Sequence, residues 1–339
     1  DERHGLEGRR VGITRREFAA RLSLGVGALA LGAPGRGQEP ERCGIVVAAD
    51  VHLKPDEPRS GRSFMRFVED VNDNLPDARY VLLLGDLMDW GTDESYALMA
   101  ELQAELRPRV LGVPGNHDFR PRLAGDETGR RTDDHSMEYF VERFAYAPGP
   151  YYSFALGNTR FVMMATERCH SNPEEVSYGG WVSTEQREWL DGQLSRAESA
   201  GENVIVCSHQ GIFERAWNTH TLPYCMNPPE PLAEVLEAHP IDVSLSGHVH
   251  GQLQEHHGEM VEERDGTVWI NGGALSHARD GRMQCRYFEL VDGAPGITIR
   301  SRDVADVRST PEAEHPVGCF IEGLDVDVPL RHGVRLTGA

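Results

Sequence analysis

The chain has 339 residues, of which 39% are hydrophobic, and this composition is typical of a globular protein that buries a substantial core. It carries 34 Lys and Arg against 54 Asp and Glu, and the resulting net charge of -20 disfavours a nucleic-acid polymer as substrate or partner. Lys54 is the only lysine. The scarcity of Lys relative to Arg leaves two interpretations open: GC-rich codon usage, or an acidic surface adapted to high salt.

Residues 1–40 are predicted to be an export signal and linker. Thr14-Arg15-Arg16-Glu17-Phe18 precedes an apolar, Gly- and Ala-rich stretch over 22–33. Twin Arg before such a stretch resembles a twin-arginine export signal, so we expect a periplasmic, cell-surface or secreted protein. The alternative is an amphipathic first helix with a chance Arg pair. The stretch is too short to cross a bilayer, and we expect no transmembrane span elsewhere.

The next part of the chain alternates strands with helices. A main domain is predicted over 41–302, followed by a C-terminal extension of uncertain structure over 303–339. Strands are predicted at 44–49, 79–84 and 109–113, with helices at 61–73 and 93–106 between them. This β-α-β-α-β order predicts an α/β fold with a parallel sheet and right-handed crossovers.

The later elements include a hairpin and a second strand and helix series. Strands at 151–155 and 160–165 flank Gly157-Asn158, which favours a β-hairpin. Ser183-Thr184-Glu185-Gln186 has the pattern of a capping box and predicts a helix that ends near residue 200. The remaining predictions are strands at 203–207, 241–246, 267–271, 284–291 and 296–301 and a helix at 230–238.

Five of the predicted strands are followed directly by side chains that bind metals. The five segments are Asp50-Val51-His52, Gly85-Asp86-Leu87-Met88-Asp89, Gly115-Asn116-His117-Asp118, Ser208-His209 and Gly247-His248-Val249-His250. Each His taken alone is more often an ordinary surface or core histidine. Ligands of α/β sheets gather beyond the carboxyl ends of the strands, so these segments are expected to meet. Imidazole, carboxylate and amide ligands suit Mn, Fe or Zn, and the set predicts a hydrolase with two divalent or trivalent metal ions.

These motifs, in this order over residues 44–251, resemble those of the calcineurin-like metallophosphoesterase superfamily. The resemblance implies a four-layer α/β/β/α sandwich with a two-metal centre. It implies that Asp50, His52, Asp86 and His250 hold one metal, and that Asp86, Asn116, His209 and His248 hold the other. Asp86 would then bridge the two ions.

The resemblance also implies a function and two further roles. The function is hydrolysis of a small phosphoester, with a phosphodiester favoured, by in-line attack of a metal-bridging hydroxide. His117 would donate a proton to the leaving group or stabilise the transition state, and Asp89 would hydrogen-bond His117 and keep it protonated. A turn or cap role remains the alternative for Asp89, and Asp118 is expected to fix its loop. The alternative functions are a phosphomonoesterase or a catalytically inactive metal-binding protein.

Features around the motifs bear on the subfamily. His52 resembles the corresponding His of class III cyclic-nucleotide phosphodiesterases and related small phosphodiesterases. Purple acid phosphatases carry a Tyr after the Gly-Asp motif, where this chain has Met88-Asp89, so that branch is disfavoured. Ser208-His209-Gln210-Gly211 departs from the His-His-Pro often found at the fourth motif, which leaves the support of His209 open. Arg120 and Arg122 are candidate substrate-binding residues, and solvated rim positions are the alternative.

Overall fold

The computed structural model describes residues 40–119, 133–144, 149–168, 179–215, 218–220, 224–276, 282–306 and 318–336. Residues 40–339 form one compact unit. Residues 1–39, which hold the predicted export signal, lie outside the described residues, as do Arg120 and Arg122. Within the described ranges, every helix is too short or too polar to cross a membrane.

The first sheet contains the three parallel strands predicted from the start of the chain. These are β1 (Arg42–Ala48), β2 (Ala78–Leu84) and β3 (Arg109–Val113). The described part of this sheet has seven strands in the order β14-β13-β12-β1-β2-β3, with β15 also paired to β13. Its antiparallel members are β12 (Arg282–Val291), β13 (Gly296–Asp306), β14 (Cys319–Phe320) and β15 (Val326–Pro329). Part of the segment beyond residue 303 therefore completes the edge of this sheet.

The second sheet is also mixed. Its order is β10-β11-β9-β7-β5-β4, and β5, β7, β9 and β11 run parallel to one another. The strands are β4 (Tyr152–Leu156), β5 (Thr159–Met163), β7 (Asn203–Cys207), β9 (Val243–Ser246), β10 (Val261–Arg264) and β11 (Thr267–Asn271). The predicted hairpin is confirmed as the antiparallel pair β4 and β5. A separate short pair joins β6 (Gly180–Trp181) to β8 (Met226–Asn227).

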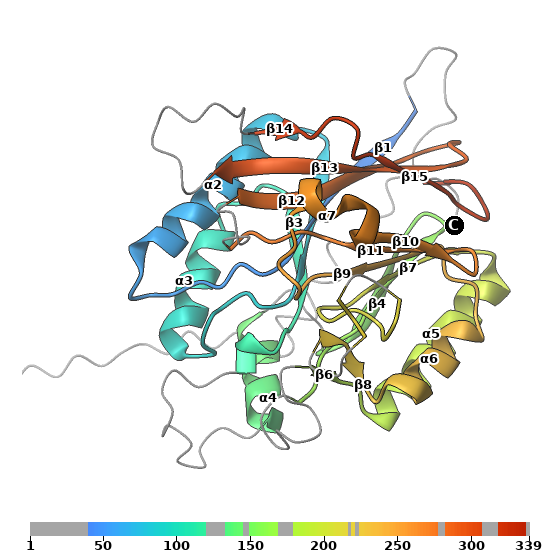
Figure 1. The fold of residues 1–339 in the computed structure, drawn as a ribbon, viewed down its shortest axis with the longest axis horizontal. Helices are drawn as coiled ribbons and strands as arrows, with labels where there is room; N and C mark the ends of the chain where they lie inside the picture. Colours follow the sequence, from blue (N-terminus) through green and yellow to red (C-terminus); the bar gives the residue numbers. More distant parts are fainter. Residues whose placement is uncertain are drawn as a thin grey trace, which may run out of the picture. The chain divides into compact units, whose positions relative to one another are not determined.

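The two sheets lie between two layers of helices, which confirms the predicted sandwich. α2 (Pro58–Asn74) and α3 (Asp93–Gln103) lie on one side, and α5 (Thr184–Ala200) and α6 (Pro229–Glu237) lie on the other (Figure 1). α4 (Asp133–Arg143) contributes Phe140 to the core beneath α2 and α3. α7 (Leu253–Met260) immediately precedes β10.

Strand β1 shows why its sequence is apolar without alternation. Val46 and Ala48 pack in the core beneath α2 and α3, whereas Ile45 and Val47 pack in the core between the two sheets. A strand that is buried on both faces needs apolar side chains at successive positions. A third core joins the second sheet to α5 and α6.

Helix α5 begins where predicted, but only half of the expected capping box forms. The Ser183 side chain accepts a hydrogen bond from the Gln186 backbone N–H. The Ser183 backbone N–H donates to Glu167 instead of Gln186, because the Gln186 side chain is engaged with the backbone of Ala165. The cap therefore also ties α5 to the segment that follows β5.

Candidate metal centre

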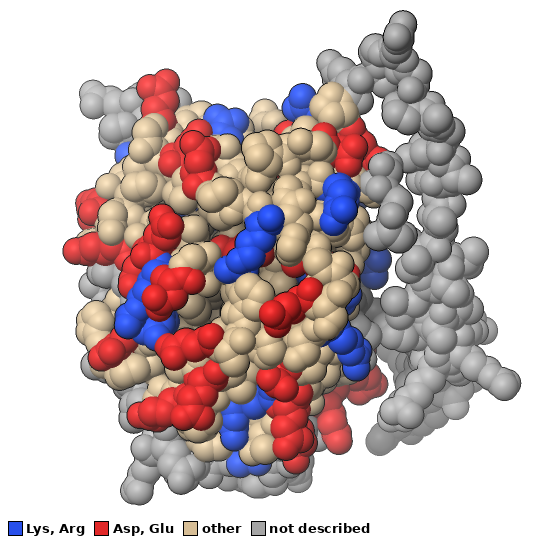
Figure 2. Space-filling view, turned by 90° about the vertical axis from the view of Figure 1, so that its right-hand side faces the viewer, with Lys and Arg blue, Asp and Glu red and all other residues tan. Residues whose placement is uncertain are grey.

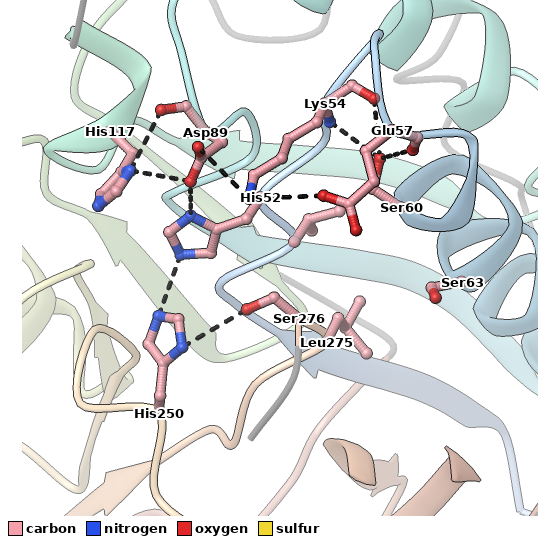
Figure 3. A pocket seen from close by; sticks show the side chains of 11 residues that line it. His52, Lys54, Glu57, Ser60, Ser63, Asp89, His117, His250, Leu275 and Ser276 are labelled. Atoms are coloured by element: carbon pink, nitrogen blue, oxygen red, sulfur yellow. Dashed lines mark hydrogen bonds and ion pairs between the residues drawn. The ribbon is translucent and has the colours of Figure 1, made fainter. Parts of the chain in front are cut away.

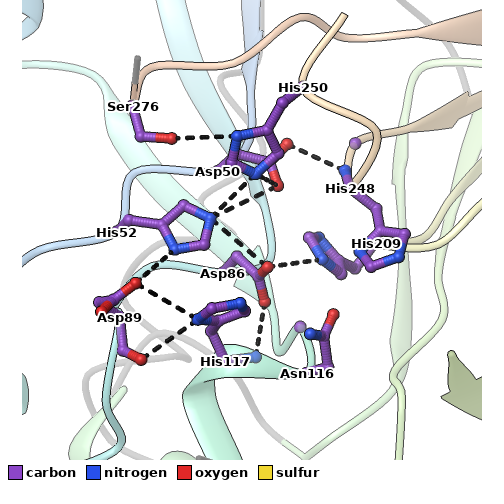
Figure 4. A network of polar contacts seen from close by, with 12 residues as sticks. Asp50, His52, Asp86, Asp89, Asn116, His117, His209, His248, His250 and Ser276 are labelled. Atoms are coloured by element: carbon purple, nitrogen blue, oxygen red, sulfur yellow. Dashed lines mark hydrogen bonds and ion pairs between the residues drawn. The ribbon is translucent and has the colours of Figure 1, made fainter. Parts of the chain in front are cut away.

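The five predicted segments meet at the carboxyl ends of five strands. Strands β1, β2 and β3 of the first sheet deliver three of them, and β7 and β9 of the second sheet deliver the other two. Backbone hydrogen bonds join the segments in pairs. Asp50 N donates to Gly85 O at 3.1 Å, and Gly247 N donates to His209 O at 2.8 Å. The side chains therefore converge at the carboxyl ends of strands from both sheets (Figure 4).

A first cluster contains the side chains of Asp50, His52, Asp86 and His250, which the resemblance to the family assigned to one metal. Their potential ligand atoms all lie within 4.8 Å of one another. Nε2 of His52 lies 3.0 Å from Nε2 of His250, and the latter lies 3.1 Å from Oδ1 of Asp50. These nitrogens and carboxylate oxygens face a common point, as a cation site requires.

A second cluster contains Asp86, His209 and His248. Nε2 of His209 lies 3.1 Å from Oδ2 of Asp86, and Nδ1 of His209 lies 2.7 Å from the carbonyl oxygen of Leu84. A carbonyl only accepts, so Nδ1 carries the proton in the neutral imidazole, and Nε2 keeps a lone pair for a metal. Asp86 belongs to both clusters, and its carboxylate is therefore placed between them.

Asn116 lies beside the second cluster and is supported by a residue that departs from the expected motif. Nε2 of Gln210 donates to Oδ1 of Asn116 at 2.9 Å, and both side chains are buried. This bond fixes the orientation of the Asn116 amide, and the second lone pair of Oδ1 stays available to a cation. Gln210 thus supports Asn116, whereas the support of His209 comes from the Leu84 carbonyl. The spacing of the motif did not predict that Asn116 and His209 are supported by different groups.

His117 and Asp89 form a third group with His52. Oδ1 of Asp89 lies 3.2 Å from Nδ1 of His52 and 3.4 Å from Nδ1 of His117, and Nδ1 of His117 also lies 3.2 Å from the Asp89 carbonyl oxygen. Burial acts to raise the pKa of Asp89, but hydrogen bonds from the two histidines and the charge of Lys54 lower it well below its usual value. Asp89 is thus a carboxylate that contacts both histidines.

The backbone of the centre adopts an uncommon conformation. Five of the seven predicted ligands have φ in the left-handed region; they are Asp50 at 56°, His52 at 47°, Asp86 at 51°, His248 at 72° and His250 at 49°. Such a conformation is found for only a few per cent of residues other than Gly, and it costs on the order of 1–3 kcal/mol at each position. Left-handed turns after strands are thus shared by three of the five ligand segments, those that follow β1, β2 and β9.

Glycines in the motifs permit the close approach of the segments. A Cβ on Gly115 would lie 2.3 Å from Oδ1 of Asp86 and 2.4 Å from its backbone N. A Cβ on Gly247 would lie 2.4 Å from Cβ of Ala49 and 2.9 Å from Oδ2 of Asp50. No side chain fits at these two positions while Asp50 and Asp86 keep their places.

Asp118 holds two of the segments together, as the sequence predicted. Its Oδ1 accepts from the backbone N–H of Leu87 at 2.9 Å and of Met88 at 3.0 Å, and its Oδ2 accepts from Gly115 N–H at 2.7 Å. Burial, reinforced by the charge of Asp86, raises the pKa of Asp118 to about 7. The side chain accepts bonds from backbone groups and is absent from both candidate metal clusters.

Two buried polar atoms that make no hydrogen bond indicate that the side chains of the centre fit metal ions. Among the described residues, Oδ1 of Asp50 and Nε2 of His209 are buried and make no hydrogen bond, although each lies at ion-pair distance, 3.1 Å, from Nε2 of His250 and Oδ2 of Asp86 respectively. Burial acts to lower the pKa of His209, but the carboxylates of Asp86 and Asp50 raise it to about 9. A bound cation would replace that proton as the partner of the buried carboxylates.

A cavity of ≈ 320 Å³ opens beside the first cluster. Its lining combines five residues of the motifs with polar and apolar side chains from outside them (Figure 3). The lining residues are His52, His117 and His250 with Asp89, Val51, Lys54, Glu57, Ser60, Ser63, Leu275 and Ser276. Sequence reasoning did not identify Lys54 as a site residue, and its proximity to His52 in the chain was the only available signal.

One face of the protein, the one on the right-hand side of Figure 1, is rich in acidic side chains. Acidic side chains spread across the face shown in Figure 2, with basic side chains scattered among them. This pattern agrees with the negative net charge and gives no basic stripe on that face for a nucleic-acid backbone. The predicted substrate contacts of Arg120 and Arg122 stay untested because both residues lie outside the described ranges.

Comparisons with known proteins agree with this geometry. Residues 44–252 match the family described as calcineurin-like phosphoesterase. The chain is 24% identical over 263 residues to a 3′,5′-cyclic-nucleotide phosphodiesterase of Nostoc sp., with 75% of this chain and 86% of the relative covered. It is 30% identical over 261 residues to the 3′,5′-cyclic adenosine monophosphate phosphodiesterase CpdA of Haemophilus influenzae, with 74% and 82% covered.

Solved structures show a similar fold. A dimetal phosphatase from Danio rerio matches with a TM-score of 0.56 and 15% identity, over 84% of this chain and 98% of that chain. The purple acid phosphatase PPD1 from yellow lupin matches with a TM-score of 0.51 and 17% identity, over 82% of this chain and 54% of that chain. At these identities the likeness concerns the fold alone.

Proposed function

The chain belongs to the calcineurin-like phosphoesterase family, and from this premise we propose that it is a binuclear-metal phosphodiesterase that hydrolyses a 3′,5′-cyclic nucleotide. One observation carries the proposal: a single carboxylate, Asp86, belongs to two adjacent His/Asp clusters, and the backbone N–H of His117 donates to the same carboxylate at 2.8 Å. The two relatives named as cyclic-nucleotide phosphodiesterases support the choice of substrate.

The residues assigned to the metals divide into two sets with one shared member. Asp50, His52, Asp86 and His250 would hold one ion, and Asp86, Asn116, His209 and His248 would hold the other. Bound there, Mn, Fe or Zn ions would supply an activated water at neutral pH and neutralise charge on the phosphoryl oxygens. The Asn116 assignment rests on its buried amide beside the second cluster.

His117 is proposed as the proton donor to the leaving group. Nδ1 of His117 is held by the carbonyl oxygen and the carboxylate of Asp89, which leaves Nε2 as the atom that can carry a proton to the substrate. Hydrolysis forms a bond between phosphorus and the oxygen of water and breaks the bond to the leaving oxygen. His117 supplies the proton that this leaving oxygen needs, and Asp89 stabilises the charged imidazole before transfer.

A direct assay tests this proposal. Purified protein with added Mn²⁺ should hydrolyse 3′,5′-cyclic AMP and bis-p-nitrophenyl phosphate, and a chelator should abolish both activities. A preference for p-nitrophenyl phosphate over both diesters would instead indicate a phosphomonoesterase. Metal binding without release from any of these esters would favour the alternative of an inactive metal-binding protein.

We also propose that the protein is exported by the twin-arginine route. Arg15 and Arg16 before the apolar stretch of residues 22–33 support this proposal. The route carries folded proteins, which suits a chain that must load its metals before it leaves the cytoplasm.

A further inference from the structure

The cavity beside the centre has a charged wall outside the five motifs. Nζ of Lys54 lies 3.7 Å from Oδ2 of Asp89 and 3.6 Å from Oε2 of Glu57, so that the lysine lies between two carboxylates. Ser276 and Leu275 lie across the cavity from this wall, and His52 and His250 lie at its side (Figure 3). Among the described residues that line the cavity, Lys54 is the only Lys or Arg.

The loop that carries Lys54 is fixed in place. Oγ of Ser60 accepts from the Lys54 backbone N–H at 2.9 Å, and it lies 3.0 Å from the carbonyl oxygen of Lys54 and 2.9 Å from that of Glu57. Lys54 and Glu57 are both partly exposed, with relative side-chain exposures of 35% and 41%. The two charged groups are therefore positioned by the backbone and still reachable by a ligand in the cavity.

Lys54 is connected to the proposed proton donor through one carboxylate. Asp89 contacts Lys54 through Oδ2 and His117 through Oδ1. Lys54, Glu57 and His117 all line the same cavity, so a substrate that reaches His117 through this cavity also meets Lys54 and Glu57. An ammonium donor beside a carboxylate acceptor suits a hydroxyl group, because a hydroxyl both accepts and donates a hydrogen bond.

We propose that Lys54 and Glu57 form a subsite for the leaving alcohol, and that they recognise a hydroxyl on the carbon next to the leaving oxygen. This inference rests on the proposed phosphodiesterase function. For a 3′,5′-cyclic nucleotide that opens at its 3′-oxygen, the recognised group is the ribose 2′-hydroxyl. Lys54 donates to that hydroxyl, and Glu57 accepts from it.

The test compares two substrates that differ only in this hydroxyl. The metal-replete wild type should hydrolyse 3′,5′-cyclic AMP with a kcat/KM ~10–100-fold above that for 2′-deoxy-3′,5′-cyclic AMP, the usual worth of hydrogen bonds to charged groups. Lys54→Met, which keeps the length of the side chain, should lose this preference, because kcat/KM should fall further for the ribose compound than for the 2′-deoxy compound. Glu57→Gln should reduce the preference in the same direction.

A matched control and two separate readouts keep the outcomes apart. Arg42→Met removes one cation from an exposed pair at the amino end of β1, and it should leave the preference unchanged. An equal loss on both substrates in Lys54→Met would show that Lys54 acts through Asp89 alone, and it would overturn the subsite. If the wild type is active but treats both nucleotides alike, the subsite is wrong while the proposed function stands. If the wild type hydrolyses neither nucleotide, the proposed function is wrong, and the subsite that rests on it is wrong as well.

Discussion

Nδ1 of His52 lies 3.2 Å from Oδ1 of Asp89, although the two residues come from different strand ends. The carboxylate accepts a hydrogen bond from Nδ1–H of His52. This bond orients the ring so that Nε2 faces His250 and the first cluster. Sequence reasoning paired Asp89 with His117 only. The structure gives the same oxygen a second contact, and this contact links the position of a proposed metal ligand to that of the proposed proton donor.

Replacement of Asp89 should therefore affect both metal binding and turnover. In Asp89→Asn, we expect metal affinity and kcat each to fall ~10–100-fold, because outer carboxylates of this kind orient the ligands that they contact. Metal titration and steady-state kinetics at saturating Mn²⁺ would measure the two effects. An unchanged metal affinity would restrict the role of Asp89 to His117.

Replacement of His117 should separate catalysis from metal binding. His117→Ala should lower kcat for a diester ~10²–10⁴-fold, the usual worth of a general acid, because it removes the imidazole that would protonate the leaving oxygen. Its metal content, measured by elemental analysis, should equal that of the wild type because His117 is absent from both proposed ligand sets. A variant that lost metal would contradict the assignment of His117 as a proton donor.

The close approach at Gly115 should make this position intolerant of any side chain. Gly115→Ala would place a Cβ 2.3 Å from Oδ1 of Asp86, so we expect weaker metal binding and a lower melting temperature. The matched control is Gly192→Ala in α5, where a Cβ meets no atom within 4 Å. That control should keep metal binding and gain ~0.5–1 kcal/mol of stability from better helix propensity. Equal behaviour of the two variants would argue against the close packing of the ligand segments.

Export should depend on the two arginines near the amino terminus. A double substitution, Arg15→Lys with Arg16→Lys, keeps the charge of the segment but removes the twin-arginine pattern. We expect this variant to accumulate in the cytoplasm, as measured by fractionation and immunoblotting, while its diesterase activity in lysate stays normal. Unchanged export of the doubly substituted protein would exclude the twin-arginine route.

Much of the fold could be predicted because the strands that carry the motifs are buried on both faces. The apolar runs that end at Ala48, Leu84 and Val113 are typical of strands in a parallel sheet that is covered on both faces. Helix α7 was not predicted, since its sequence is polar and its backbone at His256 is not helical. The short strands β14 and β15 were not predicted either, because they are defined by their pairing with β13 and not by a local sequence pattern.

The candidate centre was predictable at the level of residue types and order, but its contacts were not. Asp86 and His209 contact each other but lie more than a hundred residues apart in the chain. Their position after strands predicted that the two segments meet, and the resemblance to a family assigned both residues to one metal. The donation from Gln210 to Asn116 and the ion pair of Lys54 with Asp89 depend on side-chain orientations that no spacing rule encodes. The left-handed backbone conformation of Asp50 and Asp86 could not be predicted from the sequence either, because neither residue is a glycine.

The central claim is that Asp86 holds two metal ions at once, and metal stoichiometry tests it most directly. Elemental analysis of the protein, saturated with Mn²⁺ and then dialysed, should give about two ions per chain for the wild type. Asp86→Ala should retain less than one ion per chain, since both clusters lose the carboxylate that they share. A wild type that binds no metal, or an Asp86→Ala variant that still binds two ions, would contradict the account.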